Sequence, residues 1–388
     1  MTDEAKDSLA GLFRRFLGFG LRAWGGPAAQ IAMIRQELVE RERWMESQEF
    51  NRTLAVYQAL PGPEATELCV HFGYLRRGRI GGLLAGLGFV LPGFLLMLAL
   101  SIAYVAFSGA PWWTAAVIGF PPAVAALVVR ATHRLGTHAL HDRMLLLIGA
   151  ASMLATLLGT PFYIVLPVAG IAHMLHKRGW PVPALALVVA FLAVGLVLPD
   201  GGGSAPAGDG TADASLLELA WSGFKAGMLT FGGAYTVIPF LQADSAGPGG
   251  WVTQAEFIDA IALSGILPAP LIIFSTMLGY LGAGLLGAVV ITVAIFLPAF
   301  AFTLIGYPLF DRLVNMPRVH AFLDGVTAAV IGLIAVVAIL LAMALFPDWI
   351  KLALFAAALT ALFMWNGRAA APVVVLACGA IGAVVALT

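Results

Sequence analysis

Charged residues are scarce in this chain: they make up 11% of its 388 positions, whereas 61% of the residues are hydrophobic. Soluble domains usually carry about a quarter charged residues, so the composition excludes an ordinary soluble globular protein. Cysteine is scarcer still, because only Cys69 and Cys378 are present, far apart and in apolar surroundings. A structural disulfide is not expected, and both thiols are interpreted as inert packing.

Several common catalytic motifs are missing. The sequence has no Gly-x-x-x-x-Gly-Lys phosphate loop, no His-Glu-x-x-His and no Gly-x-Ser-x-Gly. Their absence excludes the usual nucleotide, zinc-protease and serine-hydrolase sites, and ATP drive would need a separate subunit. We therefore expect no cofactor, no resident metal, no nucleic-acid partner and no enzymatic activity.

Long apolar blocks are what the sequence does have. Several reach the roughly 20 residues that a helix needs to cross a bilayer, and none alternates with the period of two that a membrane strand would show. The 44 glycines and 22 prolines agree, since membrane helices tolerate both. The sequence thus predicts an all-α, polytopic membrane protein. The blocks are 83–107, 145–158, 182–199, 284–310, 326–346 and 369–388.

An internal repeat divides the chain into two related halves. Tryptophan, Glu-Phe and Gly-Tyr pairs recur in a fixed register together with glycine and proline motifs. We predict a first half over 1–199, a flexible linker over 200–214 and a second half over 215–388. The matches at an offset of 207 are Trp24–Pro27 with Phe231–Ala234, Trp44 with Trp251, Glu49-Phe50 with Glu256-Phe257, and Leu60–Pro63 with Leu267–Pro270; at 206 they are Gly73-Tyr74 with Gly279-Tyr280 and Leu91–Phe94 with Leu297–Phe300.

The positive charges predict how each half crosses the membrane. Sixteen of the 21 lysines and arginines precede residue 200, and cytoplasmic loops collect such residues. If the basic clusters of the first half and the charged N-terminus are all cytoplasmic, segments 16–34 and 53–75 must each enter and leave on one side. We therefore predict two re-entrant helical hairpins, then five crossings that put the linker outside. The second half would have inverted topology; a pair of short spans or a tilted helix is the alternative for each hairpin.

Both hairpins of each half contain a break rich in glycine or proline. Broken helices in inverted repeats usually carry the substrate site, and amides at a helix start favour an anion. We expect these breaks to converge near the midplane, although close helix packing would also explain them. The four breaks are Gly25-Gly26-Pro27, Pro61-Gly62-Pro63, Gly232-Gly233-Ala234 and Pro268-Ala269-Pro270.

Ionisable residues inside the hairpins are further candidates. Arg22 and Lys225 could neutralise a divalent anion, or Lys225 could extend to the external surface. Glu64, Glu67 and His71 are spaced to share one helix face and could relay protons. The two glutamates could instead cap and solvate the helix that restarts at Pro63.

These residues resemble those of the chromate ion transporter family. The segment from Phe19-Gly20 to Trp24–Ala28 is similar to its FGGP signature, and Leu60–Glu64 is similar to its PGP motif. The segment from Gly81-Gly82 to Leu91–Phe94 resembles the stretch that follows in the family. The resemblance covers both halves and implies a long-chain, two-domain member. The second half departs from the signature because Ala234 and Ala269 replace a proline and a glycine.

The resemblance implies a secondary transporter that exports chromate across the bacterial cytoplasmic membrane, with sulfate as a competing substrate. The expected partners are this small anion, membrane lipid and, as an open option, a second copy in a homodimer. Transport of sulfate, molybdate or another tetrahedral oxyanion is the alternative within the class. A passive channel and a membrane-embedded reductase are the alternatives outside it, and the reductase is disfavoured because the chain has no flavin motif, haem motif or cysteine pair.

Overall fold

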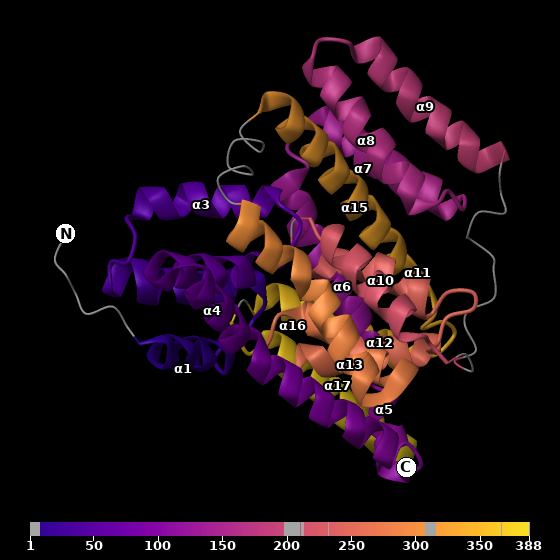
Figure 1. Ribbon diagram of the computed structural model, residues 1–388. Coiled ribbons are helices and arrows are strands. Elements are labelled where there is room, and N and C mark those ends of the chain that lie inside the picture. The colour runs from indigo at the N-terminus through magenta and orange to yellow at the C-terminus, as the bar shows by residue number, and fades with distance from the viewer. Residues whose placement is uncertain are drawn as a thin grey trace.

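The computed structural model describes residues 8–197, 210, 213–231, 233–306, 316–365 and 367–387, and every regular element in these ranges is a helix (Figure 1). This confirms the predicted all-α class. The first half contains α1 (Leu9–Gly20), α2 (Pro27–Ile34), the π-helical turn η1 (Arg35–Arg41), α3 (Ser47–Ala59), α4 (Glu64–Phe107), α5 (Pro111–Val117), α6 (Phe120–Ala139), α7 (Arg143–Leu157), α8 (Phe162–Lys177) and α9 (Pro181–Val197).

The second half follows the same order at its start. It contains α10 (Leu216–Met228), the 3-10 turn η2 (Ala234–Val237), α11 (Ile238–Ser245), α12 (Gln254–Gly265), the 3-10 turn η3 (Leu271–Phe274), α13 (Ser275–Ala301), the π-helical turn η4 (Phe302–Gly306), α15 (Pro317–Met343), α16 (Trp349–Met364) and α17 (Ala370–Leu387). Most of the predicted linker, 200–214, lies outside the described residues.

The backbone repeats the register found in the sequence. Helix α4 bends sharply at Arg77-Gly78, and α13 bends at Ala283-Gly284, 206 positions later, with nearly equal angles (Gly φ 62° and 61°). Residues eight apart in a straight helix lie about 12 Å apart, yet Gly73 contacts the Gly81 carbonyl. Helix α4 therefore folds back on itself as two antiparallel limbs. The equivalent glycines of α13, Gly279 and Gly287, make the same contact.

The two halves pack against each other through these bent helices. Helix α1 lies along α4, α10 lies along α13, and α4 and α13 contact each other at the centre. Helices α2 and α3 also pack on α4, and a second bundle forms where α15 packs on α6, α7 and α8, and α16 and α17 pack on α6. Figure 1 places α7, α8 and α9 together at one end of the molecule and α1 and α3 at the other.

Several helices are long and apolar enough to cross a bilayer. In the described part of the chain four segments meet this criterion by length and composition, and shorter apolar helices add to them. Large apolar side chains such as Leu95, Leu286 and Val293 are exposed on these segments, as expected of residues that face lipid. The chain is thus a multi-pass membrane protein. The four segments are Glu64–Phe107, Pro111–Ala139, Leu271–Gly306 and Pro317–Met343.

The predicted breaks interrupt the helices of both halves. Gly26 is the N-cap of α2, with Pro27 at its first position, where proline loses no helical hydrogen bond. The restart at Pro63 differs by one residue: α4 begins at Glu64 and Pro63 is its N-cap. The placement of the hairpins as re-entrant in a bilayer stays a prediction.

Candidate functional site

A cavity of about 610 Å³ lies where the two halves meet. Its wall combines the first break, the C-terminal part of α6, the start of η2, the end of α12 with the fourth break, and the connection from α16 to α17. Two of the predicted breaks therefore meet in one cavity. The residues that these two breaks and their flanks contribute are Gly25, Gly26, Pro27, Ala28, Ala29, Leu267, Ala269 and Leu271.

The first break needs its glycines for two different reasons. Gly25 (φ 93°) packs so closely on Arg368 that a methyl group there would come within 2.9 Å of the arginine Cα. Gly26 (φ 79°) adopts a backbone conformation that residues other than glycine rarely adopt, and a methyl group there would have no neighbour within 4 Å. The first glycine thus permits close packing, and the second begins α2 beside open space.

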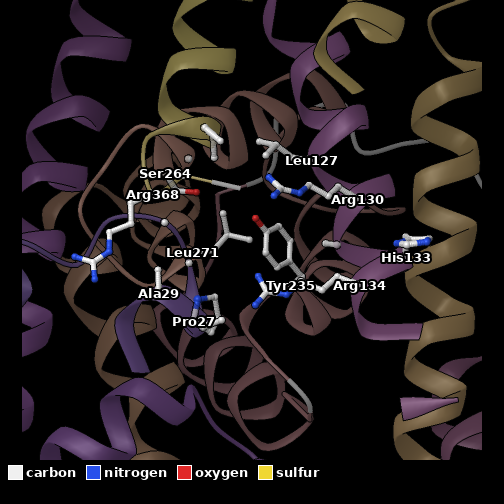
Figure 2. Close-up of a pocket in the computed structure, with 18 of the residues that line it drawn as sticks. Pro27, Ala29, Leu127, Arg130, His133, Arg134, Tyr235, Ser264, Leu271 and Arg368 are labelled. Carbon is white, nitrogen blue, oxygen red and sulfur yellow. The ribbon is translucent and has the colours of Figure 1, made fainter. Parts of the chain in front are cut away.

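Three arginines give the cavity a positive charge. Arg130 and Arg134 lie one turn apart on α6, and Arg368 lies just before α17. Figure 2 shows Arg130 and Arg134 on either side of the Tyr235 ring, with Arg368 on the opposite side of the cavity. Among the described residues that line it, none is acidic. An arginine guanidinium offers several N–H donors in a fork that suits oxyanions, so the wall fits a small oxyanion.

Hydroxyl groups complete the polar lining. Tyr235 follows the third break directly, and Ser264 ends the last turn of α12. The half-buried Arg130 donates from Nη2 to the Trp365 carbonyl at 3.4 Å, whereas Arg134 and Arg368 are exposed. The cavity is therefore open on the side of the basic α6–α7 loop, the side predicted to be cytoplasmic.

The other two breaks are closed. The backbone N–H of Gly62 donates to the Thr230 carbonyl at 2.9 Å and joins the second break to the third. Pro61, Gly62 and Pro63 are all buried, as is Gly233. None of the described residues of these two breaks lines the cavity, and Gly232 lies outside the described residues. The first and fourth breaks thus line the cavity themselves, whereas the second and third are joined by a hydrogen bond and reach the cavity only through Tyr235, directly after the third break.

The predicted cations Arg22 and Lys225 lie outside the cavity. Arg22 is exposed, donates from Nε to the Gly18 carbonyl at 3.0 Å and lies over Phe19. Lys225 forms an ion pair with Asp244 at 2.6 Å, so its charge is already compensated. The structure brings neither residue to the breaks that form the cavity.

Glu64, Glu67 and His71 share a buried face of α4, as their spacing predicted. The Tyr57 hydroxyl and His71 Nδ1 are hydrogen-bonded at 3.0 Å. Among the described residues, neither carboxylate oxygen of Glu67 nor Oε2 of Glu64 has a hydrogen-bond partner. These acids follow the second break in the sequence and do not line the cavity. In the second half of the repeat, the position equivalent to Glu64 is the apolar Leu271, which does line the cavity.

Sequence reasoning missed Arg130, Arg134, Arg368, Tyr235 and Ser264. It treated the two α6 arginines only as markers of a cytoplasmic loop. Their spacing of four residues at the end of an apolar helix was the available signal, because it puts both on one face. Nothing local in the sequence places Arg368 against Gly25.

The fold and cavity define a class: a multi-pass helical membrane protein with a positively charged cavity at its helix breaks. A family model described as "Chromate transporter" matches residues 10–175 and again 217–383, and the chain belongs to this family. The double match confirms the two homologous halves.

Related proteins carry names that agree with the family. The chain is 49% identical over 385 residues to a chromate transport protein of Pseudomonas aeruginosa, covering 96% of this chain and 91% of the relative. It is 33% identical to a chromate transport protein of Cupriavidus metallidurans, with 97% and 93% coverage. A probable chromate transport protein of Synechococcus elongatus is 32% identical, with 84% and 83% coverage. These names are of transport proteins and not of enzymes, and no solved structure gives a significant match.

Proposed function

We propose that this protein exports chromate from the bacterial cytoplasm across the inner membrane as a secondary active transporter. The observation that carries the proposal is the positively charged cavity at the helix breaks of a chain in the chromate transporter family. Chromate is a tetrahedral dianion. Guanidinium groups, hydroxyls and the amides of a helix start can replace part of its hydration shell.

Arg130 and Arg134 hold the anion in this proposal, together with the backbone N–H groups of Gly25 and Gly26, while Pro27, which has no N–H, fixes the start of α2. Both arginines line the cavity, whereas Lys225 is neutralised by Asp244. The proposal therefore gives the charge-neutralising role to α6. Sulfate has the same charge and shape, so it competes for the cavity.

The difference between the two pairs of breaks supports alternating access. One pair surrounds a cavity that opens toward the basic loops, and the other pair is closed by the Gly62–Thr230 hydrogen bond. In an inverted repeat, exchanging the conformations of the halves would close the first pair and open the second on the opposite side. The described conformation is then the one that loads the anion from the cytoplasm.

The buried acids on α4 supply proton coupling in this proposal. Glu64, Glu67 and His71 lie together inside the protein, and ionisable groups in the membrane are costly unless they have a function. An unpartnered carboxylate at such a site favours a bound proton over a bare charge. Proton uptake there would accompany the exchange of conformations.

The test is chromate flux in proteoliposomes that contain only the purified full-length protein. We expect uphill chromate movement under an imposed pH gradient and inhibition of that movement by sulfate on the same side. The chromium recovered should still be Cr(VI), because a reductase would deliver Cr(III). Downhill movement that never exceeds equilibrium would identify a channel, and no flux from folded protein would contradict the proposal.

A further inference from the structure

Asp259 is a buried carboxylate that the sequence motifs do not explain. It lies on α12 and is 2% exposed. Within the described part of the chain its one hydrogen-bond partner is the Tyr104 hydroxyl, which donates to Oδ2 at 2.7 Å from the long limb of α4. Among the described residues it forms no ion pair with a lysine, arginine or histidine, whereas Lys225 compensates Asp244 nearby in the sequence. A lone carboxylate in a membrane helix is costly in its charged form.

The surroundings of Asp259 suit a proton and not a metal cation. The titratable groups that act on it are the phenol of Tyr104 and the carboxylate of Glu256, one turn earlier on α12. A phenol that donates its hydrogen is no cation ligand, and alkali or alkaline-earth ions need several oxygen ligands. Other elements that pack on α12 also carry titratable groups. Asp244 of α11 pairs with Lys225, and Arg130, His133 and Arg134 of α6 line the cavity. The remaining two are the phenol of Tyr280 on α13 and the thiol of Cys378 on α17.

Helix α12 connects Asp259 to the anion cavity. Ser264 and Gly265, at the C-terminal end of the same helix, line the cavity. Five residues of helix separate Asp259 from Ser264, a rise of about 7.5 Å. Over such a distance through protein, a negative charge at Asp259 would weaken the binding of a dianion, and protonation would remove that repulsion. Proton binding in the middle of α12 and anion binding at its C-terminal end are therefore energetically linked.

The repeat shows that this site belongs to one half alone. The position equivalent to Asp259 in α3 is Arg52, an exposed residue of opposite charge. Glu256, by contrast, keeps its equivalent, Glu49, and serves as the capping residue of α12 with Thr253. Glu256 is explained by its role at the start of α12 and by its equivalent in the first half, whereas neither reason accounts for Asp259.

We propose that Asp259 is a proton-binding site of the transport cycle, with Tyr104 as the hydrogen-bond donor that holds its charged form. This inference rests on the proposed function, and it adds a second site to the acids on α4. During the cycle the carboxylate takes up a proton when Tyr104 moves away and releases it when the hydrogen bond re-forms. The neutral acid accompanies the anion-loaded conformation, so one proton leaves with each chromate, and the net negative charge that moves outward is driven by an inside-negative membrane potential.

The experiment compares two assays in proteoliposomes with purified full-length protein. The first measures exchange of labelled chromate for chromate at equal pH, and the second measures uphill accumulation driven by a pH gradient at clamped zero potential. Asp259→Asn imitates the protonated acid, so we expect exchange to persist and gradient-driven accumulation to disappear. Asp142→Asn, the same change at the N-cap of α7 and outside the cavity lining, is the matched control and should keep both activities.

Tyr104→Phe is the second variant, because it keeps the carboxylate and the ring while removing only the donor. We expect the pH profile of gradient-driven transport to move to higher pH, since the charged carboxylate loses a stabilising hydrogen bond. If Asp259→Asn fails to fold, the pH profile of Tyr104→Phe tests whether Asp259 binds the transported proton. A profile that does not move would then overturn the assignment.

The outcomes separate the two proposals. If wild-type protein neither exchanges nor accumulates chromate, the proposed function fails. If wild-type protein exchanges chromate but ignores the pH gradient, or if Asp259→Asn still accumulates it uphill, the Asp259 site is wrong while oxyanion transport stands.

Discussion

The two pairs of helix breaks have equivalent sequences but opposite states. The first and fourth breaks border an open cavity, with Gly25 exposed and Gly26 free of close neighbours. The second and third are joined by the hydrogen bond from Gly62 to Thr230 and, like the fourth, are buried in their described residues. The repeat-equivalent bond would run from Ala269 to Ala23. Instead, the Ala269 N–H donates to Leu267 and the Ala23 carbonyl accepts from Gln30.

The comparison shows that the break motif by itself does not make an anion site. What differs is the side chains that the tertiary structure places beside each pair. The open pair has Leu271 and Ser264, together with the arginines of α6. The equivalent positions of the closed pair hold Glu64 and Tyr57, both buried. Backbone amides are common to both pairs, whereas basic side chains line one pair and acidic side chains lie beside the other.

Removing the cavity arginines should cause the largest loss of chromate affinity, because these arginines distinguish the open pair of breaks from the closed pair. In Arg130→Gln/Arg134→Gln the open pair loses two charge-assisted donors. Each is worth about 1.5–3 kcal/mol, so chromate affinity should fall about tenfold or more for each. Equilibrium binding and the KM of flux measure the change. Arg143→Gln, an exposed arginine of the same loop, is the control, and an equal loss there would mean that only general surface charge matters.

Giving the open pair the acid of the closed pair should be nearly as damaging. Leu271→Glu introduces a carboxylate at the position equivalent to Glu64, inside the cavity. Repulsion of a dianion at close range should weaken chromate binding about tenfold or more.

Leu271→Gln has nearly the same volume without the charge and controls for packing. Similar affinities for the two variants would show that charge at this wall does not govern binding. Chromate binding to the detergent-solubilised protein is the measurement.

Accessibility should distinguish the two pairs directly. Ala29 lines the open cavity, while its equivalent, Thr236, is 1% exposed. In a background with Cys69→Ser and Cys378→Ser, a cysteine replacing Ala29 should react with a membrane-impermeant thiol reagent from the cytoplasmic side. A cysteine replacing Thr236 should react from outside, and only during turnover with chromate. Equal labelling of both from one side would contradict alternating exposure.

The smallest effect is expected far from both pairs, at Asp142. Burial acts to raise the pKa of this N-cap carboxyl, but the Leu145 N–H, the Lys177 ammonium and His173 together hold that pKa below its usual range. The resulting stability is present above the unfolded pKa, near 4, and is lost as pH falls through the folded pKa.

Asp142→Asn keeps an N-cap residue and removes the charge, so it should lower the free energy of unfolding by about 1 kcal/mol or less at pH 7, because the group is partly exposed. Thermal unfolding at pH 7 and pH 4 should show the deficit shrinking at the lower pH. Chromate flux should not change, and a loss of flux would implicate the α7–α8 bundle in transport.

Much of the fold could be predicted because its signals are local. The sequence predicted an apolar block over 83–107, and after the bend at Gly78 the second limb of α4 ends at Phe107. It also predicted breaks at Gly25-Gly26-Pro27 and Pro61-Gly62-Pro63, where the helices are interrupted. The bend itself was not predicted, because Arg77-Gly78 resembles an ordinary loop and its conformation depends on the packing of Gly73 against Gly81.

The candidate site was predicted only in part. The four breaks were expected to meet at one point because they share a motif. Which breaks lie next to each other depends on which helices are in contact. Lys225 and Arg22 were chosen for their closeness to breaks in the sequence, and the structure places them elsewhere. Arg368 contacts Gly25 across more than 340 positions of the chain, a relation that no local pattern contains.

By itself, the sequence determined that this is a helical membrane protein with two homologous halves and with helices broken at fixed points. Hydrophobic run length, proline and glycine act on the nearest few residues, so these features are readable without the fold. Tertiary structure alone decided which breaks meet, which pair is open, and that Arg130 and Arg134 face the cavity. Those outcomes depend on long-range packing between the halves and on the free-energy difference between two arrangements of the same chain, which equal motifs cannot reveal.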